Sequence, residues 1–462
     1  MITQKIYTND LEGRVDPHYY KPEFLRLISQ LDKGGQLKPL SELTEKISSG
    51  ATPKSGGNDY TNKDSGIPFI RSGDISEDEK INYDKILYIK ESVHNKKLQS
   101  SKLQKDDVLI AIVGATIGQV SVYRDNNEAN INQAIALVRC KPEVNPRYVK
   151  AFLLSGAGQK QLERIKRPVA RANINLEEVG SIKIPLASLQ TQNEIADIIQ
   201  NAYLAREEKL KQADELLNSI DGYVRQQLGI DYTEPEEEKI YIVNSQDLED
   251  NRQDPHYHNP KFATTIKQLK KGKYPIEALG KYITEIRYGA SVKNDYVDKG
   301  IPLLRILNIK PNNIDLTELV HLPKSKSKEI GNCYVYKDDL LVSRSGTIGI
   351  VAVVPQEADG FAYGSFMIKF RLNDELDGKY VSVWLNSDIS KLLIQRERIG
   401  AIQGNITIPT IQGFLLPVSS LDKQKAIADS VMEKYQKVED LKNEASRLLE
   451  EAKKKVEAMI LN

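Results

Sequence analysis

The chain has 462 residues, of which 40% are hydrophobic and 28% charged, and its formal net charge is +1. This composition is typical of a globular protein with cores large enough to fold without disulfides. A net charge this small excludes a uniformly basic protein, so any surface for nucleic acid has to arise from local segregation of charge. The cysteines, Cys140 and Cys333, fall at unmatched places, which argues against a disulfide framework. The opening residues and the lack of an 18-residue apolar stretch predict a cytoplasmic protein that makes no membrane contact.

A motif near the start returns in the second half of the chain. Residues 14–24 read RVDPHYYKPEF, and residues 252–262 read RQDPHYHNPKF. Asp-Pro begins turns, so we interpret both copies as structural turns. Asp16-Pro17-His18-Tyr19 also resembles the Asp-Pro-Pro-Tyr motif of methyltransferases, but no glycine-rich loop follows a strand to hold S-adenosylmethionine.

Each half then carries a polar loop and a short apolar strand. The first loop ends at Gly66-Ile67-Pro68, and its counterpart ends at Gly300-Ile301-Pro302. Loops on rigid sheets are where binding residues accumulate, although an ordinary surface loop has the same polar content. The basic residues in and around these loops are candidates for contact with nucleic acid: Lys54, Arg71, Arg287, Lys293 and Arg305.

Two β-rich runs follow in each half, joined by a glycine pair. Gly114 and Gly118 separate the runs within 106–123, and Gly346 and Gly349 separate those within 338–354. The pattern predicts a hairpin, and the Gly-Lys-Ser/Thr of a P-loop is absent. Small residues allow a nucleic-acid backbone to approach, so the candidate contacts here are Thr116, Arg344, Ser345 and Thr347.

A helix-like stretch in each half ends in basic and amide side chains. Arg, Gln and Asn make bidentate contacts with guanine and adenine edges, whereas a solvated helix end is the plainer interpretation. Matched positions differ in chemistry between the halves, as expected of two readers of different sequences. The candidates are Arg164, Lys166, Arg167, Arg171 and Asn173 in the first half and Arg396, Arg398, Gln403 and Asn405 in the second.

Residues 188–228 and 420–461 predict two long helices with apolar residues every 3.5 positions, the spacing of a coiled-coil seam. Subtracting 232 from the second set of numbers gives the first set in the same register, so the chain is a duplication. Ile195, Ile198, Leu204 and Leu216 are apolar outside the seam and are expected to need further cover. The predicted seam consists of Ile199, Tyr203, Leu210, Leu217, Ile220, Val224, Val431, Tyr435, Val438, Leu449 and Val456.

With these residues in place, the whole chain resembles the specificity subunits of Type I restriction-modification enzymes. The resemblance rests on both Gly-Ile-Pro segments, on residues 343–349 (SRSGTIG), and on Ile184-Pro185 and Leu416-Pro417, which lead into the long helices. The first half departs at residues 111–114, where AIVG replaces SRSG.

The resemblance implies an α+β fold in which two duplicated α/β-type target-recognition domains are separated by two long helices that form an antiparallel coiled coil. The expected boundaries are 1–186 and 230–418 for the domains and 187–229 and 419–462 for the helices. It further implies a non-catalytic subunit that reads a bipartite, asymmetric site in double-stranded DNA. Two methyltransferase (modification) subunits and, through them, restriction subunits are the expected protein partners. S-adenosylmethionine, Mg and ATP would belong to those partners.

Two other classes of function stay open. One is a self-contained DNA methyltransferase or nuclease, which would bind S-adenosylmethionine or cleave DNA when purified alone. A nuclease-like Glu-x-Lys occurs at 237–239, but it lies in an acidic linker, so we predict no catalytic residue. The histidines near Asp254 have no further cluster of metal-ligating residues to join them, so we predict no metal site. The other is a scaffold whose two domains bind protein.

Overall fold

The computed structural model describes residues 14–33, 36–54, 57–167, 172–244, 252, 254–293, 295–397 and 405–461. The chain divides into two compact units. The first unit comprises residues 1–210 and 442–462, and the second comprises residues 211–441. This division differs from the four segments expected from sequence, because each long helix is shared between the two units. No helix among the described residues is both long enough and apolar enough to span a bilayer.

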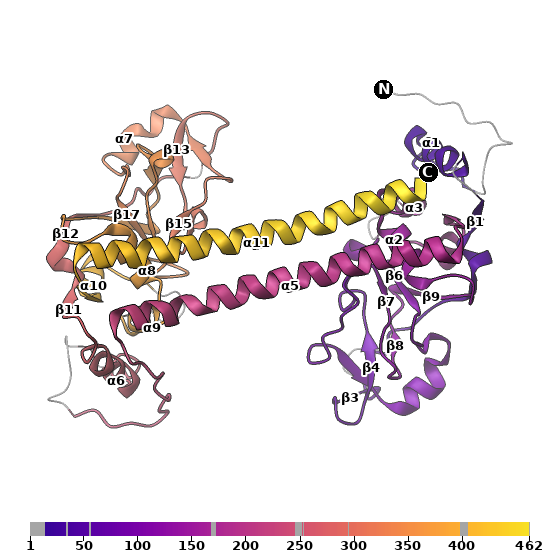
Figure 1. The fold of residues 1–462 in the computed structure, drawn as a ribbon, viewed down its shortest axis with the longest axis horizontal. Helices are drawn as coiled ribbons and strands as arrows, with labels where there is room; N and C mark the ends of the chain where they lie inside the picture. Colours follow the sequence, from indigo (N-terminus) through magenta and orange to yellow (C-terminus); the bar gives the residue numbers. More distant parts are fainter. Residues whose placement is uncertain are drawn as a thin grey trace. The chain divides into compact units, whose positions relative to one another are not determined.

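The first unit is built on two small sheets (Figure 1). The antiparallel sheet has the order β2-β9-β6-β7, formed by Thr44–Ser49, Ile135–Cys140, Val108–Ala111 and Val120–Val122. The second has the order β3-β5-β4-β8, formed by Tyr60–Thr61, Leu87–Ile89, Ile67–Ile70 and Asn130–Ile131. A further pair joins β1 (Leu37–Pro39) to β10 (Lys183–Pro185). The α-helices are α1 (Pro22–Lys33), α2 (Pro146–Leu154), α3 (Gly156–Ile165), α4 (Leu176–Gly180), the first part of α5 (Leu189–Leu228) and the last part of α11 (Leu421–Leu461).

The second unit repeats this architecture. Its antiparallel sheet has the order β12-β20-β17-β18, formed by Ile283–Tyr288, Met367–Leu372, Leu340–Ser343 and Val351–Val353. The other strands are β16-β13-β19 (Val320–Leu322, Ile301–Leu304, Ala362–Tyr363), β14-β15 (Ile309–Lys310, Asn313–Ile314) and β11-β21 (Ile276–Ala278, Leu415–Pro417). The α-helices are the last part of α5, α6 (Pro260–Leu269), α7 (Ser327–Ile330), α8 (Gly378–Leu385), α9 (Asp388–Arg396), α10 (Ile408–Gln412) and the first part of α11.

Hydrogen bonds repeat between the units at the spacing of the sequence duplication. Tyr148 donates its hydroxyl to the Pro185 carbonyl, and Tyr380 donates to the Pro417 carbonyl. The side chain of Gln192 donates to the Ala187 carbonyl at 2.9 Å, as Gln424 does to Ser419 at 2.8 Å. The tyrosine bonds tie α2 and α8 to the segment that leads into each long helix, and the glutamine bonds anchor the start of the helix to that segment.

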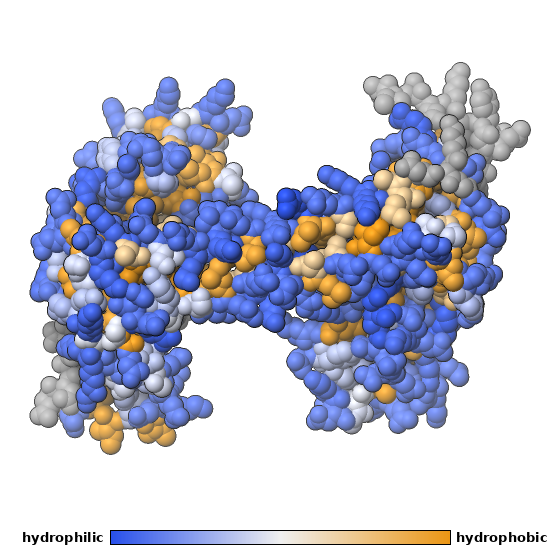
Figure 2. Space-filling view, in the orientation of Figure 1, coloured by the Kyte–Doolittle hydropathy of each residue, from blue (hydrophilic) through white to orange (hydrophobic). Residues whose placement is uncertain are grey.

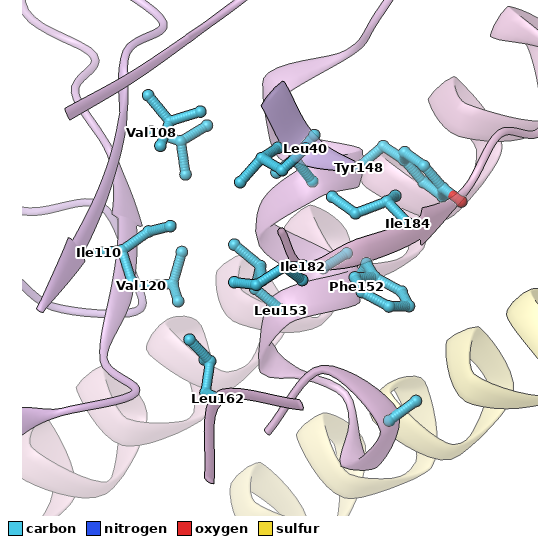
Figure 3. Close-up of a cluster of buried hydrophobic side chains, with 14 of the residues drawn as sticks. Leu40, Val108, Ile110, Val120, Tyr148, Phe152, Leu153, Leu162, Ile182 and Ile184 are labelled. Atoms are coloured by element: carbon cyan, nitrogen blue, oxygen red, sulfur yellow. The ribbon is translucent and has the colours of Figure 1, made fainter. Parts of the chain in front are cut away.

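The core of the first unit explains why β6 is apolar at every position. Val108 and Ile110 face one cluster, while Leu109 and Ala111 face another, so both sides of the strand are covered. Figure 3 shows the first cluster, in which side chains of the strands point toward those of α2, α3 and the segment around β10: Leu40, Val108, Ile110, Val120, Tyr148, Phe152, Leu153, Leu162, Ile182 and Ile184.

Within each unit the two long helices pack against each other in an antiparallel arrangement. In the first unit the beginning of α5 shares a core with the end of α11, through Ile199 and Val456. In the second unit the end of α5 shares a core with the beginning of α11, through Val224 and Val431. The predicted seam positions Ile199, Tyr203, Ile220, Val224, Val431, Val438 and Val456 are buried, and Leu210, Tyr435 and Leu449 are partly buried.

The prediction that Leu217 lies in the seam is wrong, since its side chain is 37% exposed. Leu216 takes its place and packs against Ala213, Val438 and Leu441. An α-helix has 3.6 residues per turn, so a strict 3.5-residue row drifts by about 20° per heptad away from the partner. Of the apolar residues expected to need outside cover, Ile195 is 1% exposed within the core of the first unit, whereas Leu204 is 54% exposed.

A pair of acidic side chains in the second unit gives a stability prediction. Burial raises the pKa of Asp221, and the neighbouring Asp388 adds to this effect. The pKa of Asp221 in the folded state lies above the ordinary value of 3.8. The stability of the unit therefore falls as pH rises from 3.8 through the folded-state pKa, where the buried carboxyl loses its proton. Asp221→Asn keeps the acceptor for the Asp388 amide, 3.3 Å away. We therefore expect a higher free energy of unfolding at about pH 7 and little change at about pH 3.

Urea unfolding of the variant at both pH values checks this, with Asp231→Asn, at an exposed position of the same unit, as the control. An equal gain at both pH values, or a gain in the control, would contradict the assignment.

Candidate nucleic-acid interface

A glycine loop lies at the end of one hairpin in each unit. Strands β6 and β7 pair antiparallel, as do β17 and β18, which confirms the predicted hairpins. Gly114 and Gly118 have φ values of +81° and +94°, and Gly346 and Gly349 have values of +80° and +81°. Residues with side chains rarely adopt this conformation, so the sequence needs glycine at these positions to turn the backbone.

The segment that follows the basic helix returns to this loop in both units. Asn173 forms a β-bridge with Val113, and Asn405 forms the same bridge with Ser345. The Ile174 amide donates to the Ile112 carbonyl at 2.9 Å, and the matching Ile406 amide donates to Arg344 at 3.0 Å. The structure therefore brings Asn173 beside the loop that carries Thr116, and Asn405 beside the loop that carries Ser345 and Thr347.

Arg344 is the most distinctive side chain at these loops. Its guanidinium carbon lies 4.7 Å from the centre of the Tyr288 ring, a cation–π contact that fixes its direction. Its Nε is buried and has no hydrogen-bond partner among the described residues. The first unit has Ile112, 4% exposed, at the matching position. The side chain as a whole is partly exposed, and a guanidinium held in a fixed direction is suited to an acceptor that arrives from outside the chain.

The two loop arginines are held differently. Arg71 donates to Asp74 at 3.0 Å and 3.2 Å, and this hydrogen bonding raises the pKa of Arg71. Arg305 donates instead to the Glu318 carbonyl at 2.9 Å, and its Nε has no partner among the described residues. The Arg71 guanidinium is therefore paired with a carboxylate of its own turn, whereas the hydrogen bond of Arg305 is to a neutral carbonyl.

Arg164 is wrong as a candidate contact, because it is buried inside its unit, and the partly buried Arg396 makes the same interactions in the second unit. Arg164 is 7% exposed and stacks on the Tyr19 ring at 3.9 Å, and Arg396 stacks on Tyr257 at 4.0 Å. Each also donates to the carbonyl of the tyrosine on which it stacks, at 3.1 Å and 3.2 Å. The Asp-Pro-His-Tyr motif is thus a turn that receives the end of a helix, as we interpreted it.

The other candidates have plainer positions. Lys54 and Lys293 are exposed. Lys166 pairs with Glu163 at 3.2 Å, Arg167 with Glu178 at 3.0 Å, and Arg287 with Glu285 at 3.6 Å. Arg171, Arg398 and Gln403 lie outside the described residues. Among the residues that the structure describes, no three His, Cys, Asp or Glu side chains come together in a way that could hold a metal ion.

Sequence reasoning missed three side chains beside the second loop. Tyr288, Leu307 and Phe366 are 37%, 63% and 53% exposed. Leu307 and Phe366 line a hollow of about 380 Å³ together with Ser345, Gly346 and Thr347. The signal available in the sequence was the mismatch between the halves, since these three residues replace Ser49, Gly73 and Ala134 of the first unit.

The fold defines a class: a duplicated protein whose two α/β units each present a glycine loop and share a pair of long helices. The sequence model of the Type I restriction modification DNA specificity domain matches residues 33–215 and again 283–451. The chain belongs to this family of DNA-specificity proteins.

Individual relatives agree with this assignment. The chain is 24% identical over 463 residues to a putative type I restriction enzyme MjaX specificity subunit of Methanocaldococcus jannaschii, a match that covers 96% of this chain and 97% of the relative. It is 29% identical over 160 residues to the EcoBI specificity subunit of Escherichia coli, a match that spans only 33% of that protein.

One of the similar solved structures supports the fold. A chain from a study of complex assembly and conformational transition of the type I R-M system has a TM-score of 0.56 at 14% identity, covering 92% of this chain and 96% of that one. The S subunit of the Type-I restriction-modification system from M. genitalium has a TM-score of 0.47 at 14% identity, covering 92% and 94%.

Proposed function

We propose that each unit reads one part of a bipartite, asymmetric site in double-stranded DNA, and that the chain acts as a specificity subunit with no catalysis of its own. The observation that carries the proposal is a matched framework with unmatched side chains. The bridges at Asn173 and Asn405 are equivalent, yet Arg344 on Tyr288 stands where the first unit has Ile112 and Ser49. Equal frameworks with different donors suit two different base sequences.

We further propose that two methyltransferase subunits dock on the long helices and their flanks, and that restriction subunits join through them. Three leucines along α5 support this, because Leu189, Leu204 and Leu217 are 49%, 54% and 37% exposed, and repeated exposed leucines on one helix are typical of a surface that a partner covers. S-adenosylmethionine, Mg and ATP would then bind to the partner subunits.

A mobility shift tests the DNA-binding part of the proposal. The purified chain with its methyltransferase partner should shift duplexes that contain its site, and salt should weaken the complex because phosphate contacts contribute to binding. The chain should show neither S-adenosylmethionine binding nor DNA cleavage on its own. Specific cleavage by the isolated chain, or a specific complex with a protein but none with DNA, would replace this proposal with one of the other two classes.

The division of labour gives a second prediction. Replacing Gln403 and Asn405 with alanine should relax base preference in one half-site only, at a cost of about 1–3 kcal/mol for each lost base contact. The matched variant, with Arg171 and Asn173 replaced by alanine, should relax only the other half-site. Selection from duplexes randomised in both half-sites measures this. If both variants lost base preference at the same base pairs, the two units would not read separate half-sites.

A further inference from the structure

The second unit carries an apolar patch beside its glycine loop, formed by Leu307 and Phe366. Leu307 and Phe366 are exposed, and both line the hollow beside Ser345–Thr347. Figure 2 shows apolar side chains gathered over the part of the second unit that holds β13 and β15. Most exposed leucines stand alone, but these two residues share one hollow with a hydroxyl-bearing loop, which is the mixture that a ligand-binding surface requires.

The turn that carries Leu307 does not need this side chain. In the first unit the Arg71 amide donates to Asp74 at 2.9 Å, and in the second unit the Arg305 amide donates to Asn308 at 2.8 Å. These two turns are equivalent, yet the first has Gly73 where the second has Leu307. A Cβ added at Gly73 would meet nothing within 4 Å, so this position points into open space.

The same comparison between equivalent positions of the two units applies to Phe366. Strands β9 and β20 are equivalent, and the residue just before each strand differs: Ala134 is 7% exposed, whereas the Phe366 ring is 53% exposed. The Phe366 carbonyl accepts a hydrogen bond from the Arg344 amide at 2.9 Å. Its backbone is therefore tied to the candidate interface while its ring extends outward.

We propose that Leu307 and Phe366 contact the 5-methyl group of a thymine in the half-site read by the second unit. This inference rests on the proposed function. Family membership supplies DNA as the partner, and the thymine methyl is the apolar group that an unmodified major groove displays. The neighbouring Thr347 is exposed and Arg344 is partly exposed, so both offer donors for the polar edges around it, and apolar and polar contacts are combined at one place.

Duplexes in which deoxyuridine replaces thymine, one position at a time, test the inference directly, because uracil lacks only this methyl group. The chain in complex with its methyltransferase partner should bind about fourfold more weakly at one or two positions, all within one half-site. In the variant Leu307→Gly/Phe366→Ala, which carries the first unit's residues, the thymine and deoxyuridine duplexes should bind equally well. The single variant Leu307→Gly should show a reduced difference if the double variant does not fold.

Specific binding with no effect of deoxyuridine at any position would overturn this inference and leave the proposed function standing, as would a half-site without thymine on either strand. An undiminished deoxyuridine effect in both variants would assign the methyl contact to other residues. Loss of methyltransferase assembly in the variant, with deoxyuridine sensitivity absent from the wild type, would make the patch a protein-docking surface. Absence of any specific DNA complex would instead remove the proposed function itself.

Discussion

Glu79→Gln should destabilise the first unit by about 3–5 kcal/mol, because it leaves a buried ammonium group without its counter-charge. The Glu79 carboxylate is 5% exposed and lies 2.8 Å from Nζ of Lys150 and 2.7 Å from Arg147. Lys150 is 1% exposed and faces the Tyr203 ring of α5 at 4.7 Å. The pair thus joins the loop after β4, helix α2 and the long helix. In chemical unfolding monitored in the first unit, the variant should unfold at a lower denaturant concentration than the wild type.

The stability of the Glu79→Gln variant should depend on pH in a defined direction. Burial lowers the pKa of Lys150, while Glu79 opposes this effect. Without Glu79 the folded unit should lose the Lys150 proton more readily, so the variant's stability should rise with pH below the ordinary lysine value of 10.5. A flat pH dependence would show that the ammonium reaches solvent.

The second unit supplies the matched control. At the equivalent place Asn312 accepts from Ser382 at 2.9 Å and from Asn386 at 3.1 Å, so a neutral network replaces the ion pair. Glu79 and Asn312 share positive φ values of 65° and 63°. The double variant Glu79→Asn/Lys150→Ser should therefore be more stable than Glu79→Gln alone. If the double variant were less stable than the single one, the equivalence would fail.

Lengthening both long helices by seven residues should widen the gap in the DNA site by about three base pairs. Insertions after Ala213 and after Ala445 fall at equivalent points of the duplication and preserve the heptad register. Each adds about 10 Å of helix at about 1.5 Å per residue, and base pairs stack about 3.4 Å apart. The duplex rotates by about a third of a turn over three base pairs, so affinity should also fall.

Methylation patterns in cells that carry the lengthened gene would report the new gap. Both half-site sequences should stay as they were, because no loop is altered. An unchanged gap combined with altered half-site bases would contradict the spacer role of the helices. Insertion of a flexible seven-residue segment at the same two points is the control, and it should give no defined gap.

The duplication, the hairpins and the helix pairing were predictable because they follow from patterns within each segment. The 232-residue offset in Tyr148–Pro185 and Tyr380–Pro417 is the offset visible in the sequence. Leu217 was misplaced because a heptad count carries no information on how far a helix drifts from its partner.

The candidate site was less predictable, because exposure and ion pairing depend on residues distant in the chain. Arg164 reads as a basic helix end, yet Tyr19, far away in sequence, removes it from the surface. Lys150 reads as an ordinary lysine within α2, yet the turn at Glu79 buries its charge. Conversely, Leu307 lies in an apolar run of the sequence, IPLLRILNI, that suggests burial, yet it is exposed because its turn directs it outward.

Sequencing of methylated bases tests the central claim most directly. Genomic DNA would be compared from cells that carry the partner methyltransferase with this gene, without it, and with the variant in which Gln403 and Asn405 are replaced by alanine. We predict a motif that appears only with this gene, made of two unlike half-sites at one fixed gap, with the variant relaxed in one half-site alone. A single contiguous motif, or a variant that changes both half-sites together, would contradict the claim that each unit reads its own part of the site.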